Sequence, residues 1–268
     1  MVDINLNCDM AEGYGVYNIG SDDELIGVIG SANIVCGFHG GDPGTMRRFV
    51  ARARDAGVSI GAHPGFADLE GFGRRRIEMD PRDIEDMVIY QIGALQAIAH
   101  ACGTRVSHVK PHGALANMAA EERVYADAVS RAVQCVGDDL IMVALAESEQ
   151  HISSGLMGIR VAREGYADRL YLDDGNLAPR SLPGAVFHSA ELAVAQALRM
   201  VFDGEVTTQS GSALPVGIDT ICVHGDGPAA VAIAHALRAA LIARGARITP
   251  LDAMDLQVSG YARPSLSA

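Results

Sequence analysis

Short apolar runs alternate with longer segments of helical periodicity along most of this chain. Predicted strands cover residues 2–8, 32–36, 58–62, 105–109, 140–145, 158–162, 218–223 and 246–250. Predicted helices cover residues 22–30, 42–56, 80–102, 119–136, 190–202 and 228–244, and a short helix ends near Gly155. Strands that alternate with helices in this way form a largely parallel sheet, so the pattern predicts an α/β fold.

Polar side chains follow the carboxyl ends of these predicted strands. They are Asp9, His39, His63, Lys110, His112, Glu164 and His224. In an open sheet they would lie along one edge, whereas in a closed barrel they would meet at a single mouth. One histidine after a strand is usually structural, but this many equivalent positions favour the barrel. We therefore predict a single (β/α)-barrel domain over residues 1–268.

The strand that begins near residue 105 ends abruptly in Lys110-Pro111-His112-Gly113. Proline cannot donate to a strand ladder, and glycine adopts backbone angles that other residues avoid, so a site residue is expected here. Asp42 precedes Pro43 at a helix start and is interpreted first as an N-cap. Asp9 is equally compatible with a turn and with a catalytic role.

Composition narrows the kinds of partner. The formal net charge is −12, which argues against a nucleic-acid partner. The five cysteines are odd in number and not closely spaced, which indicates reduced thiols in a cytoplasmic protein. The first ten residues are unlike a secretion signal, and His235 and Arg238 interrupt the most apolar predicted helix, so no membrane span is expected.

Two irregular segments add candidate anion-binding residues. Three consecutive arginines, Arg74–Arg76, lie in a glycine-rich loop, where a solvent-exposed role is the commoner one. In so acidic a chain they could instead bind a carboxylate or phosphate. Residues 165–183 form a connection too long to be ordinary, and its two tyrosines favour an ordered functional lid.

Two chemistries fit such a mouth, and the residues alone do not choose between them. In one, Asp9, His63 and His112 bind a divalent metal ion that activates water. In the other, carboxylates and histidines act as general acids and bases, while Lys110 and arginines stabilise negative charge.

Several catalytic fingerprints are absent. The chain has no GxxxxGK[ST] phosphate loop, no GxGxxG motif after its first strand and no GxSxG elbow. Cys8, Cys36 and Cys222 lie at strand ends and could be nucleophiles, but buried structural thiols are commoner at such positions.

A series of long motifs runs through the chain in a fixed order. They are Asn7-Cys8-Asp9-Met10, Ser31-Ala32-Asn33-Ile34, Cys36-Gly37-Phe38-His39, Gly61-Ala62-His63-Pro64-Gly65, Gly71-Phe72-Gly73-Arg74-Arg75, Tyr90-Gln91-Ile92-Gly93-Ala94-Leu95, Val109-Lys110-Pro111-His112-Gly113-Ala114-Leu115, Ala167-Asp168-Arg169 and Val223-His224-Gly225-Asp226. Together they resemble the LamB/YcsF family, and the resemblance extends from Asn5 to Gly245.

The resemblance implies an irregular (β/α) barrel of about seven strands, similar to those of the glycoside hydrolase/deacetylase superfamily. It also implies ATP-dependent opening of the lactam 5-oxo-L-proline (pyroglutamate) to L-glutamate. ATP with Mg²⁺ would be the co-substrate, and subunits B and C would be the partners. Ala11 stands where the family typically has glycine and could tighten the first loop. Ala116 stands where the family typically has tyrosine, which leaves substrate preference open.

These implications and the chemistry of a lactam give each candidate a hypothetical role. The expected catalytic residues are Asp9, Glu12, His63, Lys110 and His112. The two acids would act as bases or orient water, the histidines would shuttle protons or hold a metal ion, and the lysine would neutralise developing charge. The expected substrate- or phosphate-binding residues are His39, Arg75, Glu164, Asp168, Arg169, Arg180, His224 and Asp226.

Two alternatives remain beside this hypothesis. One is a metal-dependent deacetylase or amidohydrolase that acts without ATP. The other is a non-catalytic subunit whose pocket holds a ligand while a partner performs the chemistry.

Overall fold

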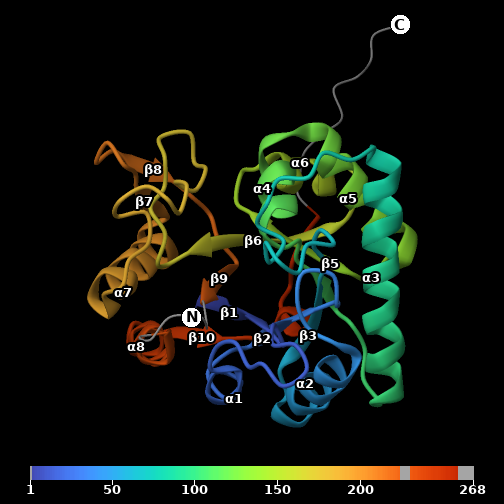
Figure 1. Cartoon of the computed structure of the whole chain (residues 1–268). Coiled ribbons are helices and arrows are strands. Elements are labelled where there is room, and N and C mark those ends of the chain that lie inside the picture. The colour runs from blue at the N-terminus through green and yellow to red at the C-terminus, as the bar shows by residue number, and fades with distance from the viewer. Residues whose placement is uncertain (1, 224–229, 259–268) are drawn as a thin grey trace, which may run out of the picture.

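The computed structural model describes residues 2–223 and 230–258, in which seven parallel strands close into a barrel (Figure 1). The barrel strands are β1 (Val2–Met10), β2 (Ser31–Val35), β3 (Ser59–His63), β4 (His108–Val109), β5 (Ile141–Leu145), β6 (Arg160–Tyr166) and β9 (Thr220–Val223). They pair in that order, and β9 pairs with β1 to complete the ring. The predicted α/β barrel of about seven strands is therefore confirmed.

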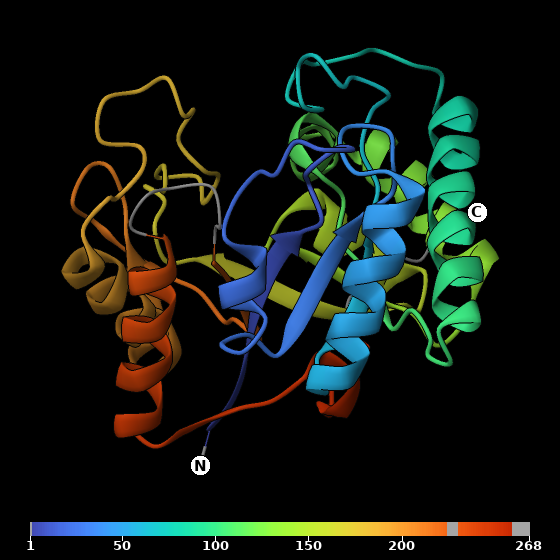
Figure 2. The same ribbon diagram turned by 60° about the horizontal axis from the view of Figure 1, so that its bottom comes forward.

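Helices cover the outside of the barrel. They are α1 (Asp22–Leu25), α2 (Pro43–Ala56), α3 (Pro81–Ala101), α4 (Gly113–Glu121), α5 (Arg123–Val136), α6 (Glu149–Leu156), α7 (Ala190–Leu198) and α8 (Ala230–Ala243). Figure 2 shows the blue strands between α8 on one side and α2 and α3 on the other. Each long helix buries one apolar stripe, as Ile84, Val88 and Leu95 of α3 illustrate.

The two faces of the barrel wall differ in chemistry. In β1, Leu6 and Cys8 belong to the apolar core under the helices, whereas Asn5 and Asn7 form hydrogen bonds with other strands inside the ring. All four side chains are fully buried. In β1, strand alternation therefore separates an apolar outer face from a polar inner face, and that inner face leads to Asp9 at the mouth.

The expected N-cap at Asp42 is confirmed. Its Oδ1 accepts hydrogen bonds from the backbone N–H groups of Gly44 (2.9 Å) and Thr45 (3.1 Å), at the start of α2. Its Oδ2 also accepts from the N–H of Gly15 at 3.0 Å, which ties the loop after β1 to this helix. Asp42 therefore caps α2 with one carboxylate oxygen and holds the loop after β1 with the other.

Several boundaries differ from the sequence-based expectation. The helix expected from residue 119 begins at Gly113 and is broken at Glu122, whose extended backbone (φ −126°, ψ 118°) separates α4 from α5. β1 and β6 run further than expected, so Asp9 and Glu164 lie within strands and not after them. The strand ladder sets the direction of a side chain within a strand, whereas the direction of a side chain in a turn varies with the turn.

Five further short elements lie around the barrel. β7 (Glu205–Thr207) and β8 (Ala213–Pro215) form an unexpected antiparallel pair beyond α7, whose last turn continues as a π-helix, Arg199–Asp203. β10 (Ala246–Ile248) pairs with β1 outside the ring, and a 3-10 turn, Leu251–Ala253, follows it.

The chain carries no disulfide, since all five cysteines are described and free. Among the described helices, none combines the length and apolar character needed to cross a bilayer.

Candidate functional site

A cavity of about 420 Å³ opens at the carboxyl ends of the barrel strands. All five expected catalytic residues line it: Asp9, Glu12, His63, Lys110 and His112. They come from three different strands of the barrel and the turns that follow them, so closure of the sheet brings together residues up to 103 positions apart, as for Asp9 and His112. These five side chains therefore meet at one mouth of the barrel, as the sequence predicted.

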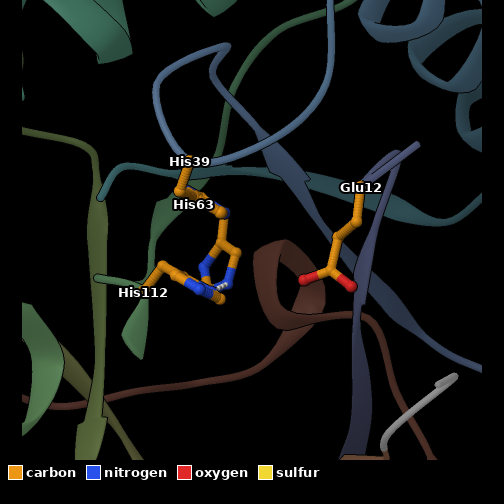
Figure 3. A group of neighbouring side chains, drawn as sticks. All are labelled: Glu12, His39, His63 and His112. Carbon is orange, nitrogen blue, oxygen red and sulfur yellow. Dashed lines mark hydrogen bonds between the residues drawn. The ribbon is translucent and has the colours of Figure 1, made fainter. Parts of the chain in front are cut away.

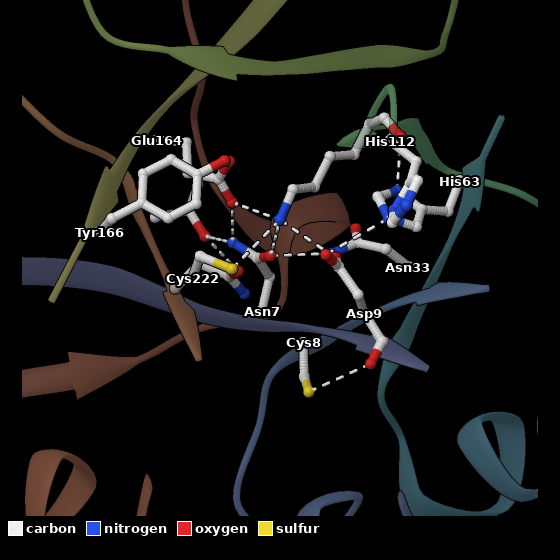
Figure 4. Close-up of polar contacts among 12 residues, drawn as sticks. Asn7, Cys8, Asp9, Asn33, His63, His112, Glu164, Tyr166 and Cys222 are labelled. Atoms are coloured by element: carbon white, nitrogen blue, oxygen red, sulfur yellow. Dashed lines mark hydrogen bonds and ion pairs between the residues drawn. The ribbon is translucent and has the colours of Figure 1, made fainter. Parts of the chain in front are cut away.

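Lys110 lies at the centre of a buried charged cluster (Figure 4). Its Nζ is 2.8 Å from Glu164 Oε1 and 3.0 Å from Asp9 Oδ1. It also donates to Asn7 Oδ1 and Cys222 Sγ, each at 3.2 Å. Only 5% of the Lys110 side chain is exposed. With neighbours on all sides, this ammonium group organises the two carboxylates, and it would have to release one of them to contact a substrate.

The charges in this cluster reinforce one another. Burial opposes ionisation of Asp9, but the adjacent His63 ring and the Lys110 ammonium outweigh it and hold the pKa of this carboxyl well below its usual range. Burial likewise opposes the charge on Lys110, yet Asp9 and Glu164 hold its pKa well above the usual value. Asp9 is therefore a carboxylate and Lys110 an ammonium at neutral pH.

Two histidines face Asp9 from the other side. His63 Nδ1 lies 2.6 Å from the backbone carbonyl of Lys110, and His112 Nε2 lies 2.8 Å from that of Phe72. Carbonyl oxygens only accept, so these nitrogens carry hydrogen atoms and donate them. The remaining nitrogens, His63 Nε2 and His112 Nδ1, face each other at 2.9 Å, and the former is 3.2 Å from Asp9 Oδ2.

The inner proton of this pair has an assignable place. Burial, followed by the neighbouring His63, lowers the pKa of His112 to about 3, so its Nδ1 is an acceptor. A hydrogen atom on His63 Nε2 then satisfies both His112 Nδ1 and Asp9 Oδ2. The Asp9–His63–His112 chain can therefore take up or release a proton at the cavity wall.

His39 supports this chain from behind. Its ring stacks on that of His112 with centroids 3.7 Å apart and an angle of 3° between planes. It is 1% exposed, and burial, followed by the charges of His112 and His63, holds its pKa well below the usual value. The ring is thus neutral and packs against the site, so the expected substrate contact from His39 is replaced by a contact with His112.

Asp9, His63 and His112 also have the donor set of a metal site. Asp9 Oδ2 and His112 Nδ1 lie 3.2 Å and 2.9 Å from His63 Nε2, close to the roughly 3 Å that separates two ligand atoms of one ion about 2.1 Å away. Each histidine donates its outer N–H to a backbone carbonyl, as metal-binding histidines usually do. The chemistry and hydrogen bonding of these three residues therefore suit a divalent ion.

A second combination, Glu12 with three histidines, fits less well. Glu12, His39, His63 and His112 offer ligand atoms within 4.8 Å of one another, and Figure 3 shows the Glu12 side chain extending toward the rings. A ring nitrogen binds a metal in the plane of its ring, so the stacked His39 and His112 cannot both bind one ion. Glu12 remains at the mouth, where it can approach a bound substrate or water.

Glu164 is anchored by Tyr166, which sequence reasoning did not single out. The Tyr166 hydroxyl donates to Glu164 Oε2 at 2.6 Å, and its ring lies over the Lys110 ammonium at 5.6 Å. Glu164 is 2% exposed, so it serves the charged cluster and has little surface left for substrate. Cys222 is not an activated nucleophile, because burial raises the pKa of its thiol well above the usual value.

Arginines line the outer part of the cavity. Arg74, Arg169 and Arg180 all contribute to its wall. Arg169 is 7% exposed, and its guanidinium donates to the backbone carbonyl of Ala178 at 2.6 Å, which fixes its direction. Burial, followed by the like charge of Arg180, lowers the pKa of Arg169. An anionic ligand here would relieve that repulsion.

A model of the LamB/YcsF family matches residues 4–256 of the chain. Proteins from Brevibacillus brevis and Bacillus subtilis that are named as the A subunit of 5-oxoprolinase are 49% and 46% identical over 248 and 252 residues. These alignments cover 92% and 94% of this chain and 98% of each relative. This chain belongs to the LamB/YcsF family.

A solved structure extends the comparison to the fold. The lactam utilization protein from Thermus thermophilus is 42% identical and superimposes with a TM-score of 0.88, covering 92% of this chain and 99% of that protein. The barrel described above is therefore the barrel of a LamB/YcsF protein, and the motif-based assignment to the family is confirmed.

Within this LamB/YcsF barrel, some expected ligand-binding residues lie elsewhere. Arg75 was expected at the site but pairs with Asp68, outside the main cavity, because the loop turns its side chain away, and Arg74 takes the inward position. Asp168 does not line the cavity as the described residues define it; its carbonyl instead accepts from the N–H of Phe187. His224 and Asp226 lie outside the described residues.

The two departures from the family pattern have clear positions. Ala11 adopts φ +65°, a region that favours glycine, and its N–H donates to Asp22 Oδ2 at 2.8 Å. Ala116 lines the cavity near the carboxyl end of β4, so a larger side chain there would reduce the space for a ligand.

Proposed function

We propose that this chain is the A subunit of an ATP-dependent 5-oxoprolinase, which opens the lactam of 5-oxo-L-proline to give L-glutamate. The observation that carries the proposal is near-complete alignment, at almost half identical residues, with proteins named for that component. The lactam utilization protein from Thermus thermophilus supports the same class of substrate. We further propose subunits B and C as the partners of this chain.

The cavity chemistry supports opening of a lactam. A lactam carbon is a poor electrophile, and phosphorylation of its oxygen by ATP would create a leaving group there. Water must then be deprotonated as it attacks this carbon, and the ring nitrogen must be protonated as the C–N bond breaks. The ionised Asp9 and the proton on His63 Nε2 suit these two transfers. The opened chain then carries an acyl phosphate, which a second water converts to L-glutamate and phosphate, with ADP as the other product.

Other residues would bind and orient the reactants. Arg169 and Arg180 would hold the substrate carboxylate or the phosphate at the outer wall. Glu12 would orient water from the mouth. Lys110 would keep Asp9 ionised and aligned through its 3.0 Å contact.

ATP with Mg²⁺ enters the proposal as the co-substrate of the complete complex. The chain carries no phosphate-loop motif, and the cavity combines arginines with Asp9, Glu12 and Glu164. A triphosphate would meet these acids, so we place ATP binding with the assembled complex and not with this cavity alone.

A second candidate function, metal-dependent hydrolysis of an amide without ATP, is favoured by the Asp9–His63–His112 donor set. A divalent ion bound there would lower the pKa of a water molecule and polarise a carbonyl. The roles of Glu12 and the arginines would be unchanged.

Glutamate release from 5-oxoproline tests the proposal. Reactions containing the chain, subunits B and C, ATP and Mg²⁺ are compared with reactions that each omit one component. The 5-oxoprolinase proposal expects release only in the complete reaction. Release that persists without ATP and stops after chelation and dialysis would favour the metal-dependent hydrolase instead.

A further inference from the structure

A row of four residues, one on each of four neighbouring strands, runs along the barrel wall beneath the cavity. Strand pairing places Asp9 of β1 beside Asn33 of β2, Asn33 beside Gly61 of β3, and Gly61 beside His108 of β4. Asn33 and His108 are fully buried. The row therefore connects the proposed catalytic carboxylate to a histidine three strands away.

Hydrogen bonds run along this row and fix the Asn33 amide (Figure 4). Asn33 Nδ2 donates to Asp9 Oδ1 at 2.9 Å and to Asn7 Oδ1 at 2.8 Å. Asn33 Oδ1 lies 3.1 Å from His108 Nε2. Asn7 is itself oriented, because its Nδ2 donates to Glu164 Oε1 and its Oδ1 accepts from Lys110. A flipped Asn33 amide would face acceptors with its oxygen.

The lack of a side chain at Gly61 allows His108 to contact Asn33. A Cβ atom at position 61 would lie 2.2 Å from the Cδ2 and Nε2 atoms of His108. The glycine therefore leaves a gap in the row, and the His108 ring fills it to reach Asn33. On its other side, His108 Nδ1 lies 2.9 Å from Ser107 Oγ. Burial lowers the pKa of His108 to about 3, so one hydrogen atom is available, and it belongs on Nε2.

This arrangement assigns the two oxygens of Asp9 to different tasks. Oδ1 accepts from Asn33 and Lys110, whereas Oδ2 faces His63. Two donors converging on one oxygen prevent the carboxylate from rotating freely. As the described residues define the cavity, Asn33 and His108 do not line it, so Asn33 acts on the reaction through Asp9 and through Asn7, whose Oδ1 also accepts from Lys110.

We propose that Asn33, held by His108 across the gap at Gly61, is a positioning residue that directs Asp9 Oδ2 toward His63 and the cavity. The proposal rests on the proposed function for its kinetic test only. Loss of the Asn33 donor leaves Oδ1 with Lys110 alone, and the carboxylate can then turn away from His63.

Kinetics of Asn33 variants test this proposal in the complete reaction with ATP, Mg²⁺ and subunits B and C. Asn33→Ala removes the donor, and Asn33→Leu keeps the approximate size but carries no polar group. For both, kcat is expected to fall about 10- to 100-fold, the usual effect of removing the partner of a site residue, with KM within about twofold. Gly61→Ala is expected to lower kcat in the same way by displacing His108, although it removes no polar group.

Asn5→Ala is the matched control. Asn5 is an equally buried barrel asparagine; its Nδ2 donates to Ser31 Oγ and the Thr249 carbonyl, and its Oδ1 accepts from Thr220, so none of these hydrogen bonds reaches Asp9, Lys110 or Glu164 directly. Its loss should weaken folding and leave kcat within about twofold of wild type. An Asn33→Ala kcat equal to that of Asn5→Ala would overturn the proposal.

Crystal structures of wild type and Asn33→Ala give a readout that needs no activity. Rotation of the Asp9 carboxylate away from His63 in the variant supports the positioning role, and an unmoved carboxylate refutes it. If wild type fails to release glutamate in the complete reaction, the proposed function has failed, and the Asp9 orientation alone decides the positioning role.

Discussion

Lys110→Met tests whether the charged cluster stabilises the barrel. The wild-type ammonium lies 2.8 Å from Glu164 Oε1 and 3.0 Å from Asp9 Oδ1, and the two carboxylate side chains are 2% and 19% exposed. Removing one partner of a buried ion pair leaves uncompensated charge and typically costs about 3–5 kcal/mol. We expect a loss of that size in the free energy of unfolding at pH 8.

The effect of Lys110→Met on the free energy of unfolding should also depend on pH. The folded-state pKa of Asp9 lies below its unfolded value, so Asp9 contributes stability above about pH 4, and this is lost as pH falls through the folded pKa. The difference between wild type and Lys110→Met should therefore be largest at neutral and alkaline pH and shrink in acid.

A second substitution separates stability from catalysis. Adding Glu164→Gln to Lys110→Met removes one of the two orphaned negative charges, leaving that of Asp9, while keeping a side chain of the same shape beside Tyr166. The double variant should recover roughly half or more of the lost stability, but not the turnover, because Asp9 still lacks its ammonium partner. Urea unfolding followed by far-UV circular dichroism measures this cycle, since the chain has no tryptophan. A loss below about 1 kcal/mol for Lys110→Met would refute the buried-charge reasoning.

Three further predictions follow from other sites. Asp42→Ala removes the cap of α2 and should cost about 1–2 kcal/mol in urea unfolding, and an unchanged midpoint would contradict the capping role. Burial raises the pKa of Asp22 from 3.8 to about 6, so ionisation of this carboxyl lowers the stability of the fold as pH rises through that interval. Asp22→Asn still accepts from the Ala11 N–H, and its free energy of unfolding should exceed that of wild type by up to about 3 kcal/mol at pH 8 and by nothing below pH 3.8. Equal stability of the two proteins at pH 8 would contradict this prediction. Arg180→Met should raise the KM for 5-oxoproline about tenfold with kcat little changed. Arg82→Met, at an exposed position outside the cavity wall, is the control and should leave KM unchanged. An unchanged KM for Arg180→Met would show that Arg180 does not bind the substrate.

The sequence predicted the parts of the site that depend on strand ends. Parallel strands place their carboxyl ends at one edge, so His63, Lys110 and His112 could be expected together from the ends of β3 and β4. Arg74 and Arg75 show the limit of such reasoning, because adjacent loop residues point in opposite directions and only the folded loop decides which one faces the cavity.

The polar interior of the barrel was not predicted. Asn7 and Asn33 occupy alternating strand positions, and the same alternation would suit a strand with one face in water. Their uncharged amides, placed between apolar residues on strands that are otherwise buried, are the signal that could have indicated an internal network. The hydrogen-bond partners of these two asparagines are 24 to 213 residues apart, as for Asn33 with Asp9 and Asn7 with Thr220, so they depend on barrel closure.

Glutamate release by Asp9→Asn is the most direct test of the account. The variant keeps the size of Asp9 and an acceptor for Lys110 but removes the carboxylate that faces His63. In the complete reaction with ATP, Mg²⁺ and subunits B and C, we expect wild type to release glutamate and folded Asp9→Asn to be at least about 100-fold slower. Full activity of the folded variant would contradict the assignment of catalysis to this cavity.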